Sequence, residues 1–285
     1  MSGQRLAVKE RINSLSKVSI DIKKLLEAGA HFGHQTSRWH PKMAPYIHSK
    51  RDGSHIIDLT KTVEALERGL DFLSKTASSG KQILLVSTKR QAKDKIREVA
   101  EATGMPYVSV RWLGGMLTNQ ATIGARIRHL KELETRMASG DLAARYSKLE
   151  VQRIASEIEE MNHHYGGIKE MTGKPAAVFV VDVLTDYLAV REARKLGIPV
   201  VALADSNVDP TQIDYPIPCN DDATKTINLM LDYVRQAIEE GQTKSRKKAE
   251  TEQKKAKIED KPAQQTTENQ NQPPQEQSKI EPVKV

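Results

Sequence analysis

Three apolar runs of strand length constrain the fold more strongly than any other feature of the sequence. They are Q-I-L-L-V-S at 82–87, P-A-A-V-F-V-V-D at 175–182 and I-P-V-V-A-L-A-D at 198–205. Continuous apolar runs of this length are typical of strands that are buried on both faces. We therefore predict a sheet with helices on both sides.

Amphipathic stretches alternate with these runs. Apolar residues recur every three or four positions between 60 and 80, and again between 92 and 104, which indicates helices that end at Gly80 and Gly104. Further strands are expected at 55–59 and near 107–110. The alternation predicts an α/β fold whose strands, including 55–59, run parallel in one sheet.

The alternation stops between Met116 and Tyr165, where the composition is helical throughout. Two apolar stripes lie on either side of a turn at Ser139-Gly140, and they can pair as an antiparallel coiled-coil hairpin. The first stripe comprises Ile123, Ile127, Leu130, Leu133 and Met137, and the second comprises Leu149, Ile154, Ile158, Met161 and Tyr165. We interpret this stretch as an arm inserted into the α/β domain.

These patterns divide the chain into four parts. Residues 1–18 form an N-terminal arm, and residues 19–110 and 172–241 form the α/β domain around the inserted hairpin at 111–171. A short edge strand at Y-P-I-P and a last helix that opens at N-D-D-A close the domain. Residues 242–285 lack aromatic residues and are rich in Gln and Lys, so we expect a disordered tail.

Charge and composition limit the classes of partner. The formal net charge is +7 and the pI about 9.3, which suits a polyanionic partner such as nucleic acid. With Cys219 as the sole cysteine, neither an intrachain disulfide nor a cysteine zinc cage can form. No apolar run approaches the roughly 20 residues of a membrane span. We therefore expect a cytoplasmic protein without a membrane partner.

The stretch A-H-F-G-H-Q-T-S-R-W-H-P-K-M at 30–43 carries the densest chemistry and lacks apolar periodicity, so we expect an ordered functional loop. Its histidines first suggest a metal, but the Cys partners or the H-E-x-x-H helix of zinc sites are missing. We expect no metal and no cofactor. Arg38-Trp39 instead offers charge beside a stacking plane for RNA. The candidate RNA-binding residues of this region are Arg38, Trp39, His40, Lys42, Lys50 and Arg51.

An enzymatic alternative rests on Asp58, Asp182 and Asp205, each at the end of a predicted strand. Ligands of open α/β sheets bind beyond the carboxyl ends of the strands, where three carboxylates could hold Mg²⁺ with Thr88 and Lys89 nearby. Asp is also common at such positions because it caps helices and fixes turns. No sequence motif for a nucleotide-binding loop or a catalytic nucleophile supports catalysis. We therefore expect no enzyme.

Two groups of cations outside the loop complete the candidate interface. Lys89, Arg90 and Lys93 lie near a predicted helix start, where a cation opposes the helix dipole, so an external phosphate explains them better. Replacing Lys89 and Lys93 with Ala should then weaken RNA binding without unfolding the protein. Trp112, where the chain leaves the sheet for the hairpin, suits the core and RNA equally. The remaining candidates are Arg111, Asn119 and Arg126.

Many co-linear blocks between residues 19 and 240 resemble the bacterial small-subunit ribosomal protein S2 family. They include the stretch at 30–43, H-I-I-D-L-T-K-T at 55–62, R-W-L-G-G-M-L-T-N at 111–119 and A-R-K-L-G-I-P-V-V-A-L-A-D-S-N-V-D-P at 193–210. The resemblance implies a flavodoxin-like domain with an inserted coiled-coil hairpin. It also implies binding to small-subunit rRNA and to neighbouring ribosomal proteins, including the large S1 protein, with no catalysis.

The match to the family pattern is incomplete at three positions, and the tail lies outside it. His40 occupies a position where Asn is usual in the family. Val183 occupies the position after the strand-end Asp, where Pro is often found, and Cys219 occupies a position where Gly is common. We expect that the protein is not a homo-oligomer. The competing functions are a Mg²⁺-dependent or phosphoacceptor enzyme on the same fold and an RNA chaperone that acts outside the ribosome.

Overall fold

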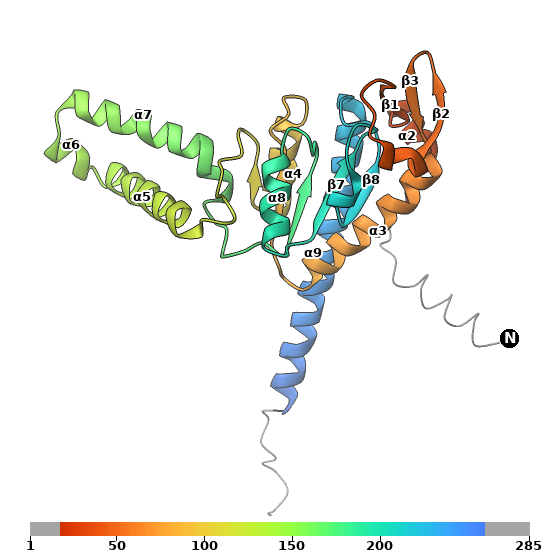
Figure 1. The fold of residues 1–285 in the computed structure, drawn as a ribbon. Helices are drawn as coiled ribbons and strands as arrows, with labels where there is room; N and C mark the ends of the chain where they lie inside the picture. Colours follow the sequence, from red (N-terminus) through yellow and green to blue (C-terminus); the bar gives the residue numbers. More distant parts are fainter. Residues whose placement is uncertain (1–17, 260–285) are drawn as a thin grey trace, which may run out of the picture. The chain divides into compact units, whose positions relative to one another are not determined.

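The computed structural model describes residues 18–259, and its centre is a five-stranded parallel sheet in the order β5-β4-β6-β7-β8 (Figure 1). Each neighbouring pair of strands is parallel, which confirms the predicted fold class. The strands are β4 (Ile83–Val86), β5 (Tyr107–Val108), β6 (Ala177–Val180), β7 (Val200–Ala204) and β8 (Tyr215–Pro218). The three apolar runs that led to the prediction form the three central strands.

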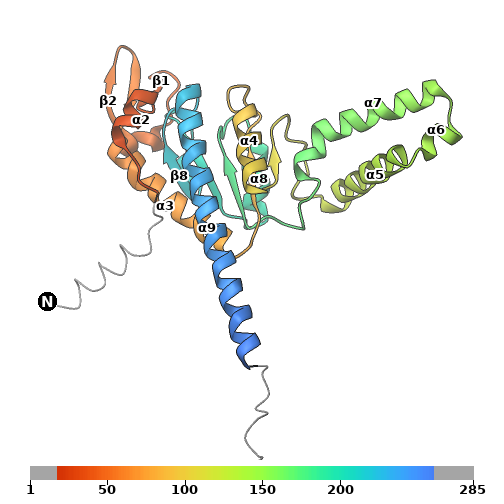
Figure 2. The same cartoon turned by 180° about the vertical axis from the view of Figure 1, so that it is seen from behind.

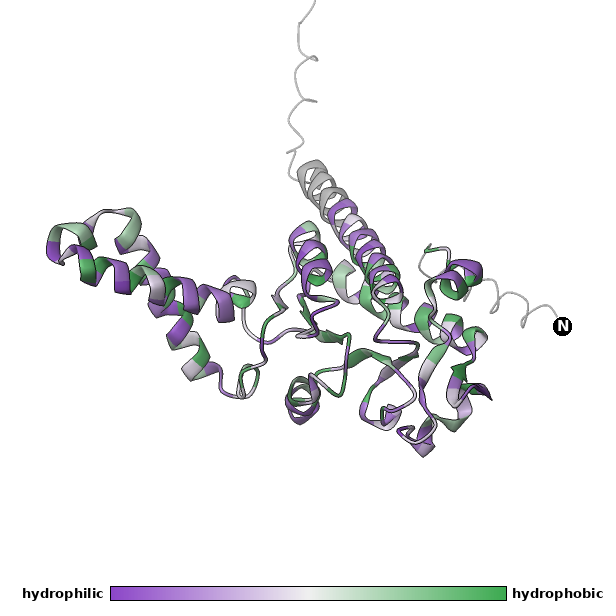
Figure 3. Cartoon of the chain, turned by 90° about the horizontal axis from the view of Figure 1, so that it is seen from above, coloured by the Kyte–Doolittle hydropathy of each residue, from purple (hydrophilic) through white to green (hydrophobic). Residues whose placement is uncertain are grey.

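Two apolar cores cover the faces of this sheet. Alternate residues of the central strands enter different cores: Leu85 and Phe179 pack on one side, and Leu84 and Val178 pack on the other. The first core is built by α3 (Leu59–Ser78), α4 (Lys93–Thr103) and α9 (Thr224–Glu259), and the second by α8 (Tyr187–Lys195). Figure 3 accordingly shows hydrophobic residues concentrated along the strands. Burial on both faces explains why these runs do not alternate with polar residues.

A separate antiparallel sheet of order β1-β3-β2 precedes the main sheet in the chain, after the short helix α2 (Ile22–Ala28). Its strands are β1 (Phe32–Gln35), β2 (Ile47–Arg51) and β3 (Ser54–Ile57), and the 3-10 helix η1 (Pro41–Tyr46) leads into β2. The prediction that 55–59 joins the parallel sheet was therefore wrong. The tight turn at Asp52 and Gly53, both with positive φ, reverses the chain and pairs β3 with β2 instead.

The insertion contains α5 (Gln120–Ala138), α6 (Asp141–Arg145) and α7 (Lys148–Tyr165), and α5 and α7 lie side by side (Figures 1 and 2). The Glu134 carboxylate joins them, because it accepts hydrogen bonds at 2.8 Å from Asn162 Nδ2 and from the Lys169 ammonium. Leu149, assigned to an inner stripe, is 60% exposed because it lies in the first turn of α7, just after the capping box at Ser147. The coiled-coil character of the insertion stays a prediction.

The last helix does not end at Gly241, where we expected the ordered domain to end. α9 continues to Glu259, and Gln242 Nε2 donates a hydrogen bond of 2.6 Å to the Thr103 carbonyl. Gly241 serves close packing, since a Cβ there would lie 2.3 Å from the Ser74 carbonyl oxygen. The remainder of the predicted disordered tail, at 260–285, and the predicted arm up to residue 17 lie outside the described residues. Within the described part, no helix is both long enough and apolar enough to cross a membrane.

Candidate nucleic-acid interface

Residues 30–43, hereafter the anchored loop, are held by the segments that follow β7 and β8. The backbone N–H of His34 donates to Ser206 Oγ and that of His40 to the Ser206 carbonyl, both at 2.8 Å. Asn220 N–H donates to the Ala30 carbonyl at 3.0 Å. At Gly33 a Cβ would lie 2.9 Å from Ser206 Oγ, so a larger residue would separate the loop from this support. The stretch is thus ordered as expected, although it contains β1 and the start of η1 rather than loop alone.

Two of the predicted RNA-binding residues in the anchored loop have partners within the protein. His40 Nδ1 accepts a hydrogen bond from Lys42 N–H and so caps η1. The Lys42 ammonium contacts the Asp209 carboxylate at 2.9 Å and Thr211 Oγ1 at 3.0 Å. The hydrogen bond from Thr211, together with Lys42, holds the pKa of Asp209 well below its usual range. These residues fix the loop to η3 (Pro210–Gln212), while the Lys42 side chain stays about half exposed.

The other cationic candidates of this region, in the anchored loop and in β2, are exposed to solvent. Arg38 is exposed, and its guanidinium has no hydrogen bond or ion pair among the described residues. Lys50 and Arg51 are exposed at the end of β2, where Arg51 lies 3.6 Å from the equally exposed Asp52. The Lys50 ammonium also lies 5.9 Å from the ring centroid of Trp39. The structure therefore brings Lys50 and Trp39 together. Arg38, Lys50 and Arg51 are all exposed to solvent.

Lys89 differs from these cations because carboxylates surround it. Its ammonium lies 2.6 Å from Asp222, 3.1 Å from Asp221 and 3.2 Å from Asp182, and the side chain is only 13% exposed. Burial alone would lower the pKa of Lys89, but the three carboxylates outweigh burial and raise it. Internal carboxylates thus account for Lys89, which the sequence analysis had explained by an external phosphate. The sequence could not show it, because Asp221 and Asp222 are more than a hundred residues away.

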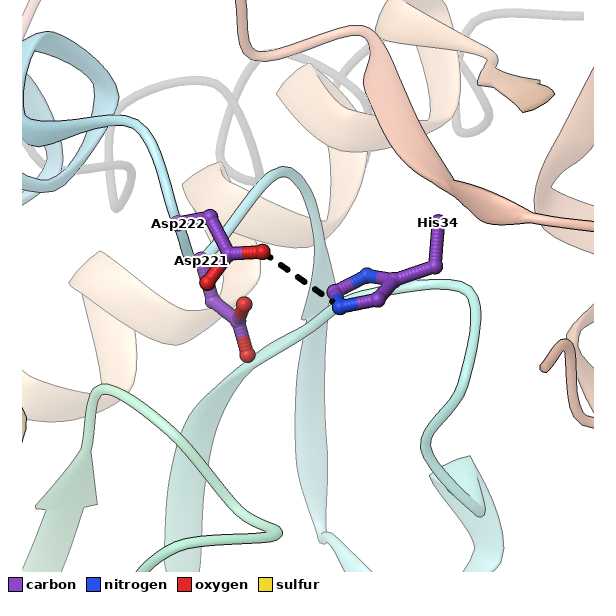
Figure 4. A group of neighbouring side chains, drawn as sticks. All are labelled: His34, Asp221 and Asp222. Carbon is purple, nitrogen blue, oxygen red and sulfur yellow. Dashed lines mark ion pairs between the residues drawn. The ribbon is translucent and has the colours of Figure 1, made fainter.

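His34 extends this ion-pair network, which comprises Lys89, His34, Asp182, Asp205, Asp221 and Asp222. Its Nε2 lies 3.3 Å from Asp222 (Figure 4). Its Nδ1 lies 3.1 Å from Asp205, and the hydrogen bond with Asp205 raises the pKa of His34. Ligand atoms of His34, Asp221 and Asp222 lie within 4.8 Å of one another, as a metal site would require. Lys89, however, already supplies a positive charge 2.6 Å from Asp222. We therefore interpret the cluster as an internal balance of charge.

The strand-end carboxylates of the enzymatic alternative have structural partners. Asp58 caps α3 by accepting from Thr60 N–H, and Asp182 accepts from the N–H groups of Leu184 and Thr185. Asp205 accepts a hydrogen bond of 3.0 Å from the Ser206 hydroxyl. Each carboxylate thus stabilises the turn that follows its strand, which is the alternative role that the sequence had suggested.

The remaining candidates lie after β4 and around the start of the insertion. Arg90 is exposed and Lys93 half-buried, and α4 begins only at Lys93. Arg111, Asn119 and Arg126 are exposed near the start of the insertion, where Asn119 caps α5. These residues follow β4 and the edge strand β5, whereas the anchored loop contacts the segments after β7 and β8 at the opposite edge. The candidates therefore come from three segments of the chain.

Glu192 on α8 is the important residue that the sequence analysis missed. Its buried carboxylate accepts hydrogen bonds from Trp112 Nε1, from the N–H groups of Gly115, Leu117 and Thr118, and from Thr118 Oγ1, at 2.7–3.1 Å. Burial alone would raise the pKa of Glu192, but these donors lower it. Trp112 itself is 6% exposed and belongs to the core. The available signal was an acidic residue between Ala189 and Ala193 on the apolar face of the helix.

Comparison with known proteins identifies the family. The family model described as Ribosomal protein S2 matches residues 25–241, which is most of the chain. The chain belongs to the ribosomal protein S2 family. This result confirms the resemblance seen in the sequence, and it makes the chain a structural component of the small subunit of the cytoplasmic ribosome rather than an enzyme.

Individual relatives agree with the family match. Small ribosomal subunit protein uS2 of Coprothermobacter proteolyticus is 49% identical over 222 residues, which cover 78% of this chain and 82% of that protein. The protein of the same name from Roseiflexus sp. is 48% identical over 225 residues, or 79% and 86% of the two chains. That from Fusobacterium nucleatum is 48% identical over 222 residues, or 78% and 90%. The similarity thus spans both the α/β domain and the insertion.

The contribution of the Glu192 carboxylate to stability can be tested by substitution. Glu192→Gln keeps the size of the side chain but turns an amide N–H₂ towards backbone donors, so we expect the free energy of unfolding to fall by about 1–3 kcal/mol. Glu160→Gln, on the exposed face of α7, is the matched control and should change it by less than about 0.5 kcal/mol. Urea denaturation followed by circular dichroism measures both. Equal effects of the two substitutions would refute the role given to Glu192.

The contribution of Lys89 to the ion-pair network can be tested in the same way. Lys89→Ala leaves Asp182 and Asp221 buried without their cation, so we expect it to destabilise the protein by roughly 3 kcal/mol. Lys93→Ala removes a cation of the same region that has no partner among the described residues, and should have little effect. Thermal denaturation of the two variants compares them directly. A Lys89→Ala protein as stable as Lys93→Ala would return Lys89 to the external role first expected.

The buried carboxyl group of Asp186 should make the stability of the protein depend on pH. Burial raises its pKa to about 6, although hydrogen bonds from Thr88 oppose this and nearby Asp182 adds to it. The folded protein then holds this proton more tightly than the unfolded chain, so its contribution to stability is present below pH 4 and lost as pH rises through 6. Between these values the wild type should lose up to about 1.4 kcal/mol per pH unit relative to Asp186→Asn. Urea unfolding of both proteins at pH 4.5, 5.5 and 7 measures the difference, and parallel curves would contradict it.

Proposed function

We propose that this protein binds small-subunit rRNA and neighbouring ribosomal proteins as a structural constituent of the small subunit during translation. The observation that carries the proposal is the anchored loop, whose backbone is fixed by Ser206 and Asn220 while Arg38 is exposed to solvent, as are Lys50 and Arg51 on β2. Exposed cations on a rigid support suit the phosphate backbone, which dominates nucleic-acid affinity. The curated relatives, each named as a small ribosomal subunit protein, support the same partner.

The rRNA-binding surface that we propose has three parts. The first comprises the anchored loop and β2, with Arg38, Trp39, His40, Lys42, Lys50 and Arg51. The second comprises Arg90 and Lys93, and the third comprises Arg111, Asn119 and Arg126 around the start of the insertion. Lys89 is assigned to the ion-pair network instead, because its ammonium already contacts three carboxylates.

We further propose that the α/β domain and the inserted hairpin bind different surfaces of the subunit. The α/β domain at 19–110 and 172–241 binds one rRNA surface, and the inserted hairpin at 111–171 reaches a second rRNA or protein surface. Tyr146 and Leu149, which are 41% and 60% exposed, offer apolar contacts to a neighbouring protein. We also propose that the protein contacts the S1 protein, as the resemblance to the S2 family implies, and that it is not a homo-oligomer.

A salt titration tests the proposed rRNA binding. Combined replacement of Arg38, Lys50 and Arg51 with Ala removes three exposed cations, so the log–log slope of rRNA affinity against salt should decrease by about 2–3. The matched control replaces Arg68, Lys81 and Lys195, which are exposed elsewhere and have no partner among the described residues. Filter binding of small-subunit rRNA between 50 and 300 mM salt, about the range in which such slopes are resolved, gives both values. An identical slope change in the control would show that only net charge matters.

A further inference from the structure

His55 on β3 is buried without a hydrogen-bond partner. Its side chain is 1% exposed, and neither Nδ1 nor Nε2 has a partner among the described residues. A buried polar group left in this way costs about 1–3 kcal/mol of stability. His55 lies on the central strand of the antiparallel sheet, directly opposite Lys50 of β2, and therefore within the region that carries the exposed cations.

The Trp39 indole lies against the His55 ring. The ring centroids are 5.0 Å apart and the planes are tilted by 38°. Trp39 is only half-buried, and its indole N–H has no hydrogen-bond partner in the described part of the chain. Its indole therefore forms part of the outer cover of His55 and is held there by ring contacts alone, with the Lys50 ammonium 5.9 Å from its centroid.

The backbone beside Trp39 is fixed although the side chain is not. Arg38 N–H donates to the Gln35 carbonyl, and His40 N–H donates to the Ser206 carbonyl. Trp39 can thus change rotamer while the loop keeps its place, and such side-chain changes are common when interfaces form. A turn of the indole away from β3 would open His55 to a ligand beside Lys50, which lies directly opposite His55 on β2.

The chemistry around His55 indicates what this ligand is. Burial lowers the pKa of His55, and Lys50 lowers it further, so the imidazole is neutral with one N–H donor and one acceptor nitrogen. The exposed cations nearby favour an anionic partner. RNA combines phosphate acceptors and a 2′-hydroxyl that donates and accepts with bases that stack on aromatic side chains.

We propose that Trp39 and His55 form a nucleotide-binding site for rRNA, in which the Trp39 indole stacks on an unpaired base and His55 hydrogen-bonds the ribose–phosphate backbone. This inference rests on the proposed rRNA binding and adds to it a site that binds a single unpaired nucleotide. It also gives the unpaired nitrogens of His55 a partner in the assembled subunit, so the site is less stable in the free protein than in the complex.

His55→Phe tests the proposal because it keeps a ring against Trp39 and removes both nitrogens. We expect opposite changes: a higher urea midpoint for the free protein and a tenfold loss of affinity for full-length small-subunit rRNA, equal to about 1.4 kcal/mol. Ser87→Ala is the matched control, since the Ser87 hydroxyl is also buried and unpartnered but lies at the end of β4 in the main sheet. It should raise the midpoint and leave rRNA affinity unchanged.

Tryptophan fluorescence provides a readout that does not depend on the stability of His55→Phe. The emission of the wild type should change when rRNA is added, and Trp39→Phe should abolish most of the change, because Trp112 is buried in the core. Unchanged rRNA affinity in His55→Phe, or an rRNA-induced change that persists in Trp39→Phe, would overturn the site while leaving binding by the cations intact. Failure of the wild type to bind rRNA would instead refute the proposed function.

Discussion

The two hydrogen bonds that Ser206 accepts from the backbone of the anchored loop connect the two sheets of this protein. Ser206 is fully buried, directly follows Asp205 at the end of β7, and contacts His34 through its hydroxyl and His40 through its carbonyl. The antiparallel sheet and its cations are thereby fixed to the parallel sheet just beyond the end of β7. A rigid support of this kind lets a short polar loop keep one conformation, so that little ordering entropy opposes binding.

The cations of this protein have two distinct roles. Lys89 is directed inwards, where it neutralises the carboxylates that follow the strands, and it thereby permits several acidic turns to lie close together. Arg38, Lys50 and Arg51 are directed outwards and are available to phosphate. Net charge indicates that a polyanion is a suitable partner, but only the three-dimensional arrangement shows which side chains are free to contact it.

The sequence predicted what depends on local pattern and missed what depends on distant contacts. The three apolar runs identified the central strands because burial on both faces leaves a continuous local signal. Glu192 and the carboxylates around Lys89 could not be assigned, since their partners lie far away in the chain. The ordered domain was expected to end at Gly241, yet α9 continues and Gly241 permits close packing against α3. The anchored loop is ordered as expected, whereas the strand inside it depends on pairing with β3.

Sedimentation of the full-length protein with small ribosomal subunits tests whether the protein binds the subunit through its exposed cations. Purified subunits stripped of this protein are incubated with the wild type or with the Arg38, Lys50 and Arg51 triple-alanine variant, and are then separated on a sucrose gradient. We expect the wild type to migrate with the subunits in stoichiometric amount and the variant to be displaced at lower salt. A wild-type protein that stays at the top of the gradient, apart from the subunits, would contradict this expectation.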